Sequence, residues 1–253
     1  MKKLDIICDI ETLGTSLDAT MIQIAAVACD ISTRTFKGAF NDFINVEKSD
    51  IIVTGGTLKW WAKTNPELFA KILEKGKSSE KEVLCEFLHW LDRVKDVAKR
   101  EFHEDVELCF WGNGILFDNA ILRAHCEKYD FTYPIKFWND RDIRTLLSLA
   151  SIKSGKSEKQ LRDSCVDKAD TLHDAMNDCK LEMRLAFLCY DILFGKYVEP
   201  AKKEEPKQTP VKPAPKAQEK ADTKIEIEVL PAKEKTEPVA EGKSKGKSGF
   251  FSK

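Results

Sequence analysis

An abrupt change of composition after Tyr197 sets the strongest limit on what this chain can fold into. Seven of the nine prolines lie beyond this residue, and no aromatic side chain follows it before Phe250. Lys, Glu and Ala fill most of the segment, so it has too little apolar surface to offset the chain entropy that folding removes. We therefore expect a folded domain over 1–197 and a disordered tail, partly polyproline II, over 198–253.

The two parts also differ in net charge. The whole chain carries −1, whereas residues 198–253 carry +3 and residues 1–197 carry −4. A body with a net negative charge does not bind a polyanion through surface charge alone. If this domain binds nucleic acid, cations must offset the carboxylates at its binding site.

Eight cysteines raise the question of disulfides or zinc, but no two of them are spaced as C-x-x-C. Most lie inside apolar runs, so we expect buried free thiols in a reducing cytoplasm. The chain has no run of about 18 apolar residues that would span a membrane. Its first residues also lack the apolar segment of a signal peptide.

The hydrophobic pattern predicts strands first and helices afterwards. Strands are expected at 4–10, 21–31 and 36–46, and short turns would join them into an antiparallel meander. A further strand is expected at 107–111. Helices are expected at 57–75, 80–98, 117–129, 140–150 and 172–194. This order indicates an α/β domain in which helices pack on a sheet.

Asp9 and Glu11 form the first candidate functional group, at the end of the first predicted strand. Side chains two positions apart in a strand point to the same face, so the two carboxylates project together. They repel each other unless a cation lies between them, and a hard divalent ion prefers such oxygen ligands. The alternative is solvated charge on an edge strand, and the short pattern D-x-E does not decide between the two.

Asp118 is the second candidate, and it follows a predicted strand and a glycine-rich turn in the segment WGNGILFD. We expect it in the first turn of a helix, where an aspartate also interacts favourably with the helix dipole. The glycines of the turn would allow the backbone to approach a ligand closely.

The third candidate group lies in the segment LHDAMND, which opens the last predicted helix. His173 and Asp178 would be separated by about 140° around a helix, so they share a pocket only if His173 precedes the helix. Asp174 is expected to cap the helix N-terminus. Taken alone, His173 is more simply interpreted as a structural histidine.

Taken together, the segments DIETLG, WGNGILFDNAIL and HDAMND resemble the three exonuclease motifs of the DEDDh superfamily, whose members have an RNase H-like fold. The resemblance covers roughly residues 1–195. The segments TLKWW and FWNDRDIRT are similar to the branch that holds exonuclease A of T-even phages, exonuclease VIII-like phage proteins and a mycobacterial exoribonuclease. The tail has no counterpart in this family.

The resemblance implies an RNase H-like mixed sheet flanked by helices, and a metal-dependent 3′-to-5′ exonuclease with DNA favoured over RNA. Two divalent cations, Mg²⁺ or Mn²⁺, would be held by the carboxylates, and a histidine would accept the proton of the attacking water. The implied metal-binding residues are Asp9, Glu11, Asp118 and Asp178, and His173 completes the catalytic set.

The substrate contacts that we expect are Thr12, Leu13, Trp60, Trp61, Asn113 and Phe117. One of the two tryptophans should fill the core and the other should lie near the site, where an aromatic face can stack on a base. Arg141 and Arg144 are interpreted as ion-pair partners of Asp140 or Asp142, with a phosphate contact as the alternative.

The expected ligand is the 3′ end of a nucleic acid, in the cytoplasm of a bacterium or a phage-infected cell. Phe250-Phe251, at the end of the tail, suit an anchor for a protein partner, and a homodimer is also considered. An exoribonuclease of the same fold is the first alternative function. A non-catalytic binding module is the second, although such a module has no need of four carboxylates.

Overall fold

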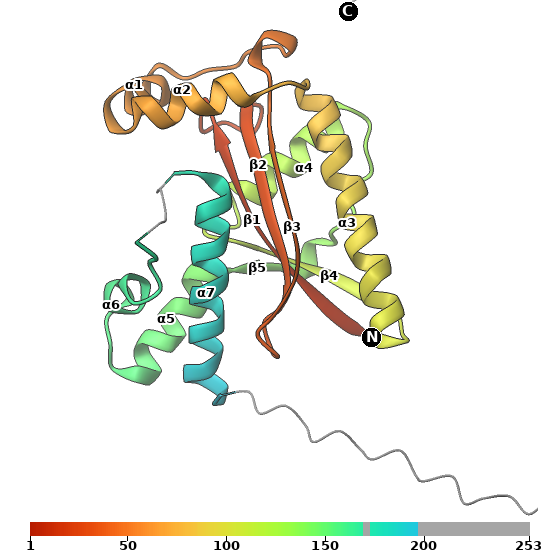
Figure 1. Cartoon of the computed structure of the whole chain (residues 1–253), viewed down its shortest axis with the longest axis vertical. Coiled ribbons are helices and arrows are strands. Elements are labelled where there is room, and N and C mark those ends of the chain that lie inside the picture. Colours follow the sequence, from red (N-terminus) through yellow and green to blue (C-terminus); the bar gives the residue numbers. More distant parts are fainter. Residues whose placement is uncertain (169–172, 197–253) are drawn as a thin grey trace, which may run out of the picture. The chain divides into compact units, whose positions relative to one another are not determined.

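The computed structural model describes residues 1–168 and 173–196, and a single mixed sheet forms the centre of this part. Its strands are β1 (Lys2–Thr12), β2 (Met21–Asp30), β3 (Thr35–Phe43), β4 (Val106–Gly112) and β5 (Asp140–Asp142). They lie in the order β3-β2-β1-β4-β5. The first three pair antiparallel, whereas β4 runs parallel to both β1 and β5. The predicted meander and the mixed sheet are therefore confirmed (Figure 1).

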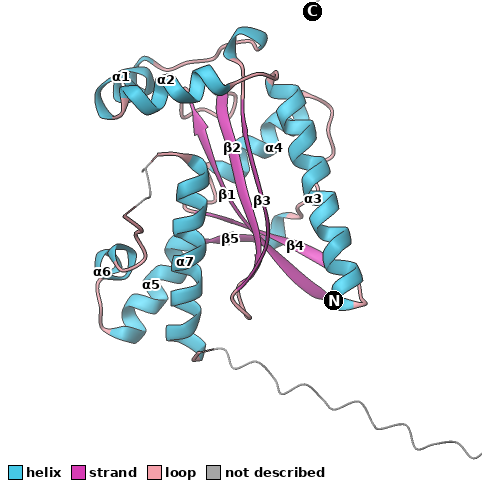
Figure 2. Cartoon of the chain, in the orientation of Figure 1, coloured by secondary structure: helices cyan, strands magenta, loops and turns pink. Residues whose placement is uncertain are grey.

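Helices cover both faces of this sheet, as Figure 2 shows. They are α1 (Gly55–Thr64), α2 (Pro66–Lys75), α3 (Glu80–Phe102), α4 (Asp118–Lys128), α5 (Ile143–Ser154), α6 (Glu158–Asp163) and α7 (Ala175–Phe194). Two short 3-10 helices, at Val46–Lys48 and Phe137–Asn139, complete the described elements.

The alternation of side chains in β1 divides the protein into two cores. One set of its side chains packs with α3 and α4, and consists of Leu4, Ile6, Cys8 and Ile10. On the opposite face Ile7 packs with α5 and α7. Asp9 and Glu11 share that second face because they alternate with the apolar set. The strand therefore carries its carboxylates toward the α7 side of the sheet.

β2 lies between β1 and β3 and is buried along almost its whole length. Because both of its faces are covered, its sequence, MIQIAAVACD, is a nearly continuous apolar run rather than an alternating one. The antiparallel register brings Ala25 opposite Asp9 and Gln23 opposite Glu11. The two carboxylates therefore have an alanine and an uncharged glutamine, and no basic residue, directly opposite them on β2.

A third apolar cluster closes the end of the sheet beneath α1 and α2. Its buried members are Leu13, Ile22, Trp61, Leu68 and Ile72. The indole Nε1 of Trp61 donates to the carbonyl of Thr12 at 3.0 Å, which ties α1 to the end of β1. This end of the sheet is where the candidate carboxylates lie.

The helix predicted at 57–75 is in fact two helices. Pro66 disfavours the helical conformation for the residue before it. Asn65 accordingly leaves the helix, and its side chain caps α2 by accepting from the N–H of Leu68 at 3.3 Å. The single-helix prediction is therefore wrong at this proline.

The segment 140–150 also differs from its prediction, because its first three residues form β5. Asp142 ends this strand, and its carboxylate caps α5 by accepting from the N–H of Thr145 at 2.8 Å. The helix α6 was not predicted at all. It is a short helix whose N-terminus is closed by a capping box between Ser157 and Gln160.

All eight cysteines fall within the described residues and are free thiols, six of them buried, as the absence of paired spacings predicted. No helix among residues 1–168 and 173–196 is long and apolar enough to cross a membrane. The tail over 198–253, with Phe250-Phe251, lies outside the described residues. Its boundary and its disorder therefore stay predictions.

Candidate active site

The five residues predicted to be catalytic come together in one large cavity beside the end of β1. The cavity has a volume of about 1210 Å³ and receives side chains from β1, the β4–α4 turn, α5, α6 and α7. The predicted residues that line it are Asp9, Glu11, Asp118, His173 and Asp178. Segments separated by more than 160 residues in the chain thus contribute to one site.

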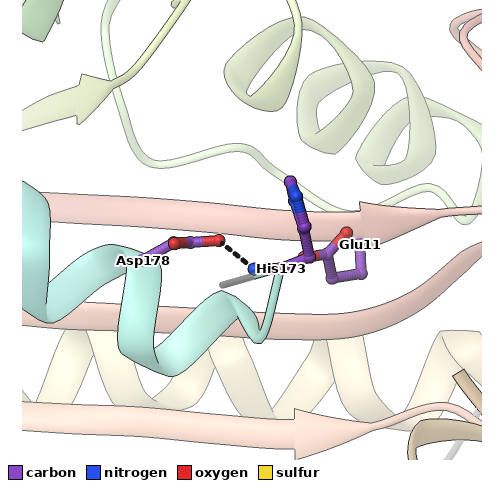
Figure 3. A group of neighbouring side chains, drawn as sticks. All are labelled: Glu11, His173 and Asp178. Atoms are coloured by element: carbon purple, nitrogen blue, oxygen red, sulfur yellow. Dashed lines mark hydrogen bonds between the residues drawn. The ribbon is translucent and has the colours of Figure 1, made fainter. Parts of the chain in front are cut away.

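Glu11, His173 and Asp178 form the tightest group in this cavity. One ligand atom from each lies within 4.8 Å of the other two, so the three can contact a single ion. Figure 3 shows that they come from β1, from the loop before α7 and from the first turn of α7. The sequence places two of these residues near the end of the domain and only the fold brings them to β1.

The backbone before α7 explains why His173 and Asp178 can share a pocket. His173 has a φ of +65°, in the left-handed region, so the chain turns sharply before the helix begins. Its backbone N–H donates to Oδ2 of Asp178 at 3.0 Å. Asp174 caps α7 by accepting from the N–H of Asn177 at 3.3 Å. The helix begins at Ala175 rather than at residue 172 as predicted, so His173 precedes it as a shared pocket requires, and the predicted capping by Asp174 is confirmed.

Asp118 opens α4 and is buried, with 4% of its surface exposed. Its Oδ1 accepts from the backbone N–H of Ile10 at 3.4 Å, which ties the start of α4 to β1 between the other two carboxylates. Gly112 makes this approach possible, because a Cβ there would lie 3.3 Å from Oδ2 of Asp118. A side chain at Gly112 would therefore crowd the carboxylate of Asp118.

Burial and mutual repulsion perturb these acids strongly. Burial raises the pKa of Asp9 well above its ordinary value, and the neighbouring Asp118 and Glu182 raise it further. Burial and Asp178 act in the same way on the pKa of Glu11. The pKa of Asp118 rises to about 7, mainly through burial. The pKa of Asp178 is also raised by burial, against the lowering effect of its bond from the His173 N–H.

No lysine, arginine or histidine within 4 Å neutralises these carboxylates among the described residues. Burying unpaired carboxylates together is costly unless something positive joins them. The donors are all hard oxygens with one imidazole beside them, which suits Mg²⁺ or Mn²⁺. The residues present therefore fit the divalent cations that the resemblance implies.

A smaller cavity of about 310 Å³ adjoins the carboxylates and has an aromatic wall. Glu11, Thr12, Trp60 and Phe117 line it. Trp60 is 40% exposed, and its ring lies edge-on to the ring of His173, with 4.8 Å between the two ring centroids. Trp61, in contrast, is buried and stacks on Phe69 at 5.1 Å. The prediction of one inward tryptophan and one near the site is confirmed.

Leu13 does not reach either of the two cavities, although it was predicted to contact substrate. Its side chain is buried in the cluster beneath α1 and α2, and its backbone N–H and carbonyl bond to Thr20 and Thr54. The position of Leu13 thus supports a role in the core.

Asn113 lies at the wall of the large cavity between two arginines. Its Oδ1 accepts from Nε of Arg144 and from a terminal nitrogen of Arg162, both at 3.3 Å. Arg141 instead donates to the backbone carbonyls of Trp138 and Asp140. The ion pairs predicted for Arg141 and Arg144 are therefore wrong within the described residues. Asp142 and Asp140 use their carboxylates elsewhere: Asp142 caps α5, and Asp140 pairs with Arg123.

Two residues of the large cavity were missed from the sequence. Arg162 carried no signal, because α6 is too short to show a periodic pattern. Glu182 did carry one, since it lies four residues after Asp178 and therefore on the same side of a helix. The same position also fits the exposed face of an amphipathic helix, so the spacing alone does not identify it.

Four carboxylates and a histidine at the end of β1, in a mixed five-stranded sheet, are the arrangement expected of a nuclease site of the DEDDh type. The family described as the 3′-5′ exoribonuclease Rv2179c-like domain matches residues 4–188. The chain therefore belongs to this family, within the DEDDh exonuclease superfamily of 3′-5′ exonucleases.

A curated relative and two solved structures are also similar. The exodeoxyribonuclease of Enterobacteria phage T4 is 23% identical over 224 residues, which is 79% of this chain and 94% of that protein. A zinc-bound E. coli exonuclease I in complex with single-stranded DNA has a TM-score of 0.51 and 16% identity, over 75% of this chain and 41% of that one.

The exonuclease I of Methylocaldum szegediense gives the same TM-score, 0.51, with 19% identity over 74% of this chain and 40% of that one. At such identities these two structures support the fold alone. The chain also spans less than half the length of either exonuclease I.

Proposed function

We propose that this protein hydrolyses phosphodiester bonds one nucleotide at a time from 3′ ends, preferably in DNA, with two divalent cations. The observation that carries the proposal is the meeting of Glu11, His173 and Asp178 within 4.8 Å, in the cavity that also holds Asp9 and Asp118. A binding module has no reason to bury so many carboxylates without cationic partners.

Four carboxylates would hold the cations, namely Asp9, Glu11, Asp118 and Asp178. When bound, the two cations supply charge that offsets the acids and the substrate phosphate, and they lower the pKa of water for attack. His173 is placed to accept the proton of that water, because it lies beside Glu11 and Asp178. Trp60 holds its ring edge-on to the imidazole and restricts its orientation.

The smaller cavity suits the terminal nucleoside. It adjoins the carboxylates through Glu11, and Trp60 offers a partly exposed ring on which a base can stack. Stacking of this kind is worth about 1–3 kcal/mol per base and does not depend on sequence. Thr12, Trp61 and Phe117 also line this cavity, so four of the predicted substrate contacts meet at one place.

Asn113, Arg144 and Arg162 suit a phosphate of the substrate. The two guanidinium groups share one amide acceptor and form no ion pair within 4 Å in the described part of the chain. Gly114 has a φ of +120°, which favours glycine, and a Cβ at this position would lie 3.5 Å from the guanidinium carbon of Arg144. A planar guanidinium group can donate two parallel hydrogen bonds to two oxygens of one phosphate.

DNA is favoured as substrate because the phage T4 relative, named an exodeoxyribonuclease, matches over 94% of its own length. The family description, which names an exoribonuclease, supports RNA as the alternative. Discrimination between DNA and RNA depends on a few contacts with the 2′-hydroxyl of the sugar.

Matched 5′-labelled DNA and RNA oligonucleotides, single- and double-stranded, test this proposal. Loss of nucleotides from the 3′ end should produce a descending ladder, with DNA degraded faster than RNA. Faster degradation of RNA would favour the exoribonuclease, and an absence of any ladder with Mg²⁺ or Mn²⁺ would reject the enzymatic function. Adding EDTA should stop the reaction, and excess Mg²⁺ or Mn²⁺ should restore it.

A further inference from the structure

Glu182 is a carboxylate of the large cavity to which the proposed mechanism gives no role. It lies on α7 four residues after Asp178, so both side chains project from the same side of the helix. Only 2% of its surface is exposed, yet it lines the cavity together with Asp9 and Asp118. A buried glutamate at this position requires a physical explanation.

The carboxylate of Glu182 lacks the partners that normally accompany a buried acid. Its Oε2 is fully buried and accepts no hydrogen bond from the described residues. No lysine, arginine or histidine of the described residues lies within 4 Å of it. Burying a charged carboxylate without a cation or hydrogen-bond donor beside it costs roughly several kcal/mol in proteins.

Glu80 shows how the same fold satisfies a buried glutamate for structural purposes. This side chain is also fully buried, on the other side of the sheet. Its carboxylate accepts from the Tyr129 hydroxyl at 2.8 Å, from Lys128 Nζ at 3.2 Å and from the Met21 N–H at 3.3 Å. Glu182 has no comparable set, so a structural role does not account for it.

The electrostatic neighbours of Glu182 are the site carboxylates. Burial raises its pKa well above the ordinary value, and the charges of Asp118 and Asp178 raise it further, whereas those of Arg162 and Arg144 lower it. Asp9 in turn is affected by Asp118 and Glu182 more than by Glu11. Glu182 therefore interacts electrostatically with Asp9, Asp118 and Asp178, which are all proposed metal-binding residues.

We infer that Glu182 is a fifth carboxylate of the metal site, and that it helps Asp118 to hold one of the two divalent cations. The inference rests on the proposed function, because it assumes that cations bind in this cavity. A cation would give the buried Oε2 the direct positive partner that it lacks among the described residues.

The test is a titration of the metal-free full-length chain with Mn²⁺ by calorimetry, with free Mn²⁺ followed by its paramagnetic resonance signal. Wild type should bind two ions. Glu182→Gln should retain the tighter ion and bind the weaker one about 10-fold or more less tightly, the range found when groups that support metal ligands are removed. Glu182→Asp should recover part of that affinity, because it retains a carboxylate.

Glu80→Gln is the matched control, since it makes the same change at a buried glutamate away from the cavity. It should lower thermal stability and leave both Mn²⁺ affinities unchanged. Glu182→Gln, in contrast, removes an uncompensated charge and should not lower the stability of the metal-free protein.

The outcomes distinguish a failure of the role inferred for Glu182 from a failure of the proposed metal site. If Glu182→Gln binds both ions with wild-type affinity while Asp9→Asn does not, the inference about Glu182 is wrong and the proposed metal site stands. If wild type binds no Mn²⁺, or Asp9→Asn binds it unchanged, the proposed function fails and the role of Glu182 fails with it.

Discussion

At the scale of single residues, Asp178 links the geometry of the site to its chemistry. It accepts the backbone N–H of His173 and also belongs to the group that can contact one ion with Glu11. Asp174, only four residues earlier, uses its carboxylate to cap the helix. Two aspartates in one helical turn therefore have different roles, and substitution can distinguish them.

Asp178→Asn should reduce nuclease activity to background, as should Asp9→Asn, because each removes a charge that holds the cations. Asp174→Asn is the matched control and should keep most of the activity, since asparagine caps helices about as well as aspartate. Release of labelled nucleotides from a 3′-labelled oligonucleotide gives the rates, and circular dichroism verifies folding. Undiminished activity in both Asp9→Asn and Asp178→Asn would exclude the assigned site.

His173→Ala should lower the rate about 10²- to 10⁴-fold, the usual contribution of a general base. Mn²⁺ binding should be affected little, because the carboxylates hold the ions. The measurement is the pH–rate profile of the variant beside that of wild type. An unchanged profile would reject the assignment of His173 as the base.

Asp118 gives the metal-free protein a predictable dependence of stability on pH. Its pKa rises from 3.8 to about 7 on folding, so the folded state binds this proton more tightly than the unfolded state does. The resulting stabilisation is complete below about pH 4 and is lost as the pH rises toward about 7. At about 1.4 kcal/mol per pKa unit, the loss amounts to roughly 4 kcal/mol at most.

Asp118→Asn should therefore unfold at a higher urea concentration than wild type at pH 8 in EDTA, and the two should differ little at pH 4. Urea unfolding at both pH values, followed by fluorescence, measures the difference. An equal loss of stability with pH in the two proteins would show that Asp118 is not responsible. Mg²⁺ should reduce the difference at pH 8 by stabilising the wild-type carboxylates.

At the scale of elements, α5 and α6 supply the positive charge that the acidic domain otherwise lacks at this cavity. Arg144 from α5 and Arg162 from α6 meet at the amide of Asn113, which follows β4. Three elements separated in the chain thus contribute to one cluster, which is the proposed phosphate contact. Asp142 caps α5 and Ser157 caps α6, and these caps fix where the two helices that carry the arginines begin.

Arg144→Ala and Arg162→Ala should each raise KM about 10-fold, because hydrogen bonds to charged groups contribute about 1.5–3 kcal/mol. The effect on kcat should be smaller if the arginines hold a phosphate away from the bond that breaks. Arg141→Ala is the matched control, since that side chain bonds to backbone carbonyls outside the cavity. The assay is initial rate against oligonucleotide concentration at two salt concentrations.

If Arg141→Ala changes KM as much as the other two variants do, the phosphate contact is not specific to Arg144 and Arg162. A loss of salt dependence in Arg144→Ala and Arg162→Ala is the second expected sign, because each removes a cation that contacts the nucleic acid.

At the scale of the whole molecule, the catalytic cavity is assembled within 1–168 and 173–196. The last described helix, α7, ends at Phe194, and its N-terminal half supplies Asp178 and Glu182. The segment 198–253 is predicted to be a disordered tether with a Phe-Phe anchor, and these properties lie outside the described residues. Its contribution can be tested separately from the site.

Truncation after residue 197 should leave single-turnover hydrolysis within about twofold of the full-length rate, because all proposed catalytic and metal-binding groups lie before it. Thermal unfolding should also be unchanged. Stopped-flow assays with enzyme in excess over a short oligonucleotide measure the rate. An unfolded or inactive truncated protein would show that the domain boundary is wrong.

Much of this architecture could be predicted from local pattern. Alternation in β1 placed Asp9 and Glu11 on one face, and the caps of α3 and α7 follow from residues near their ends in sequence. The errors have local physical causes as well. Pro66 divided a predicted helix, and Asp142 delayed the start of α5 by forming its N-cap. The short helix α6 had too few residues to show any period.

By itself, the sequence determined which residues are the candidates for the chemistry, because residue type, strand alternation and helix start are local properties. Only the tertiary structure decided which of them meet. It turned Trp61 into the core and Trp60 toward His173, joined Arg162 to Asn113, and buried Glu182 beside Asp118. These contacts join residues that are mostly far apart in the chain, so they depend on how β1, α6 and α7 pack and no short segment encodes them.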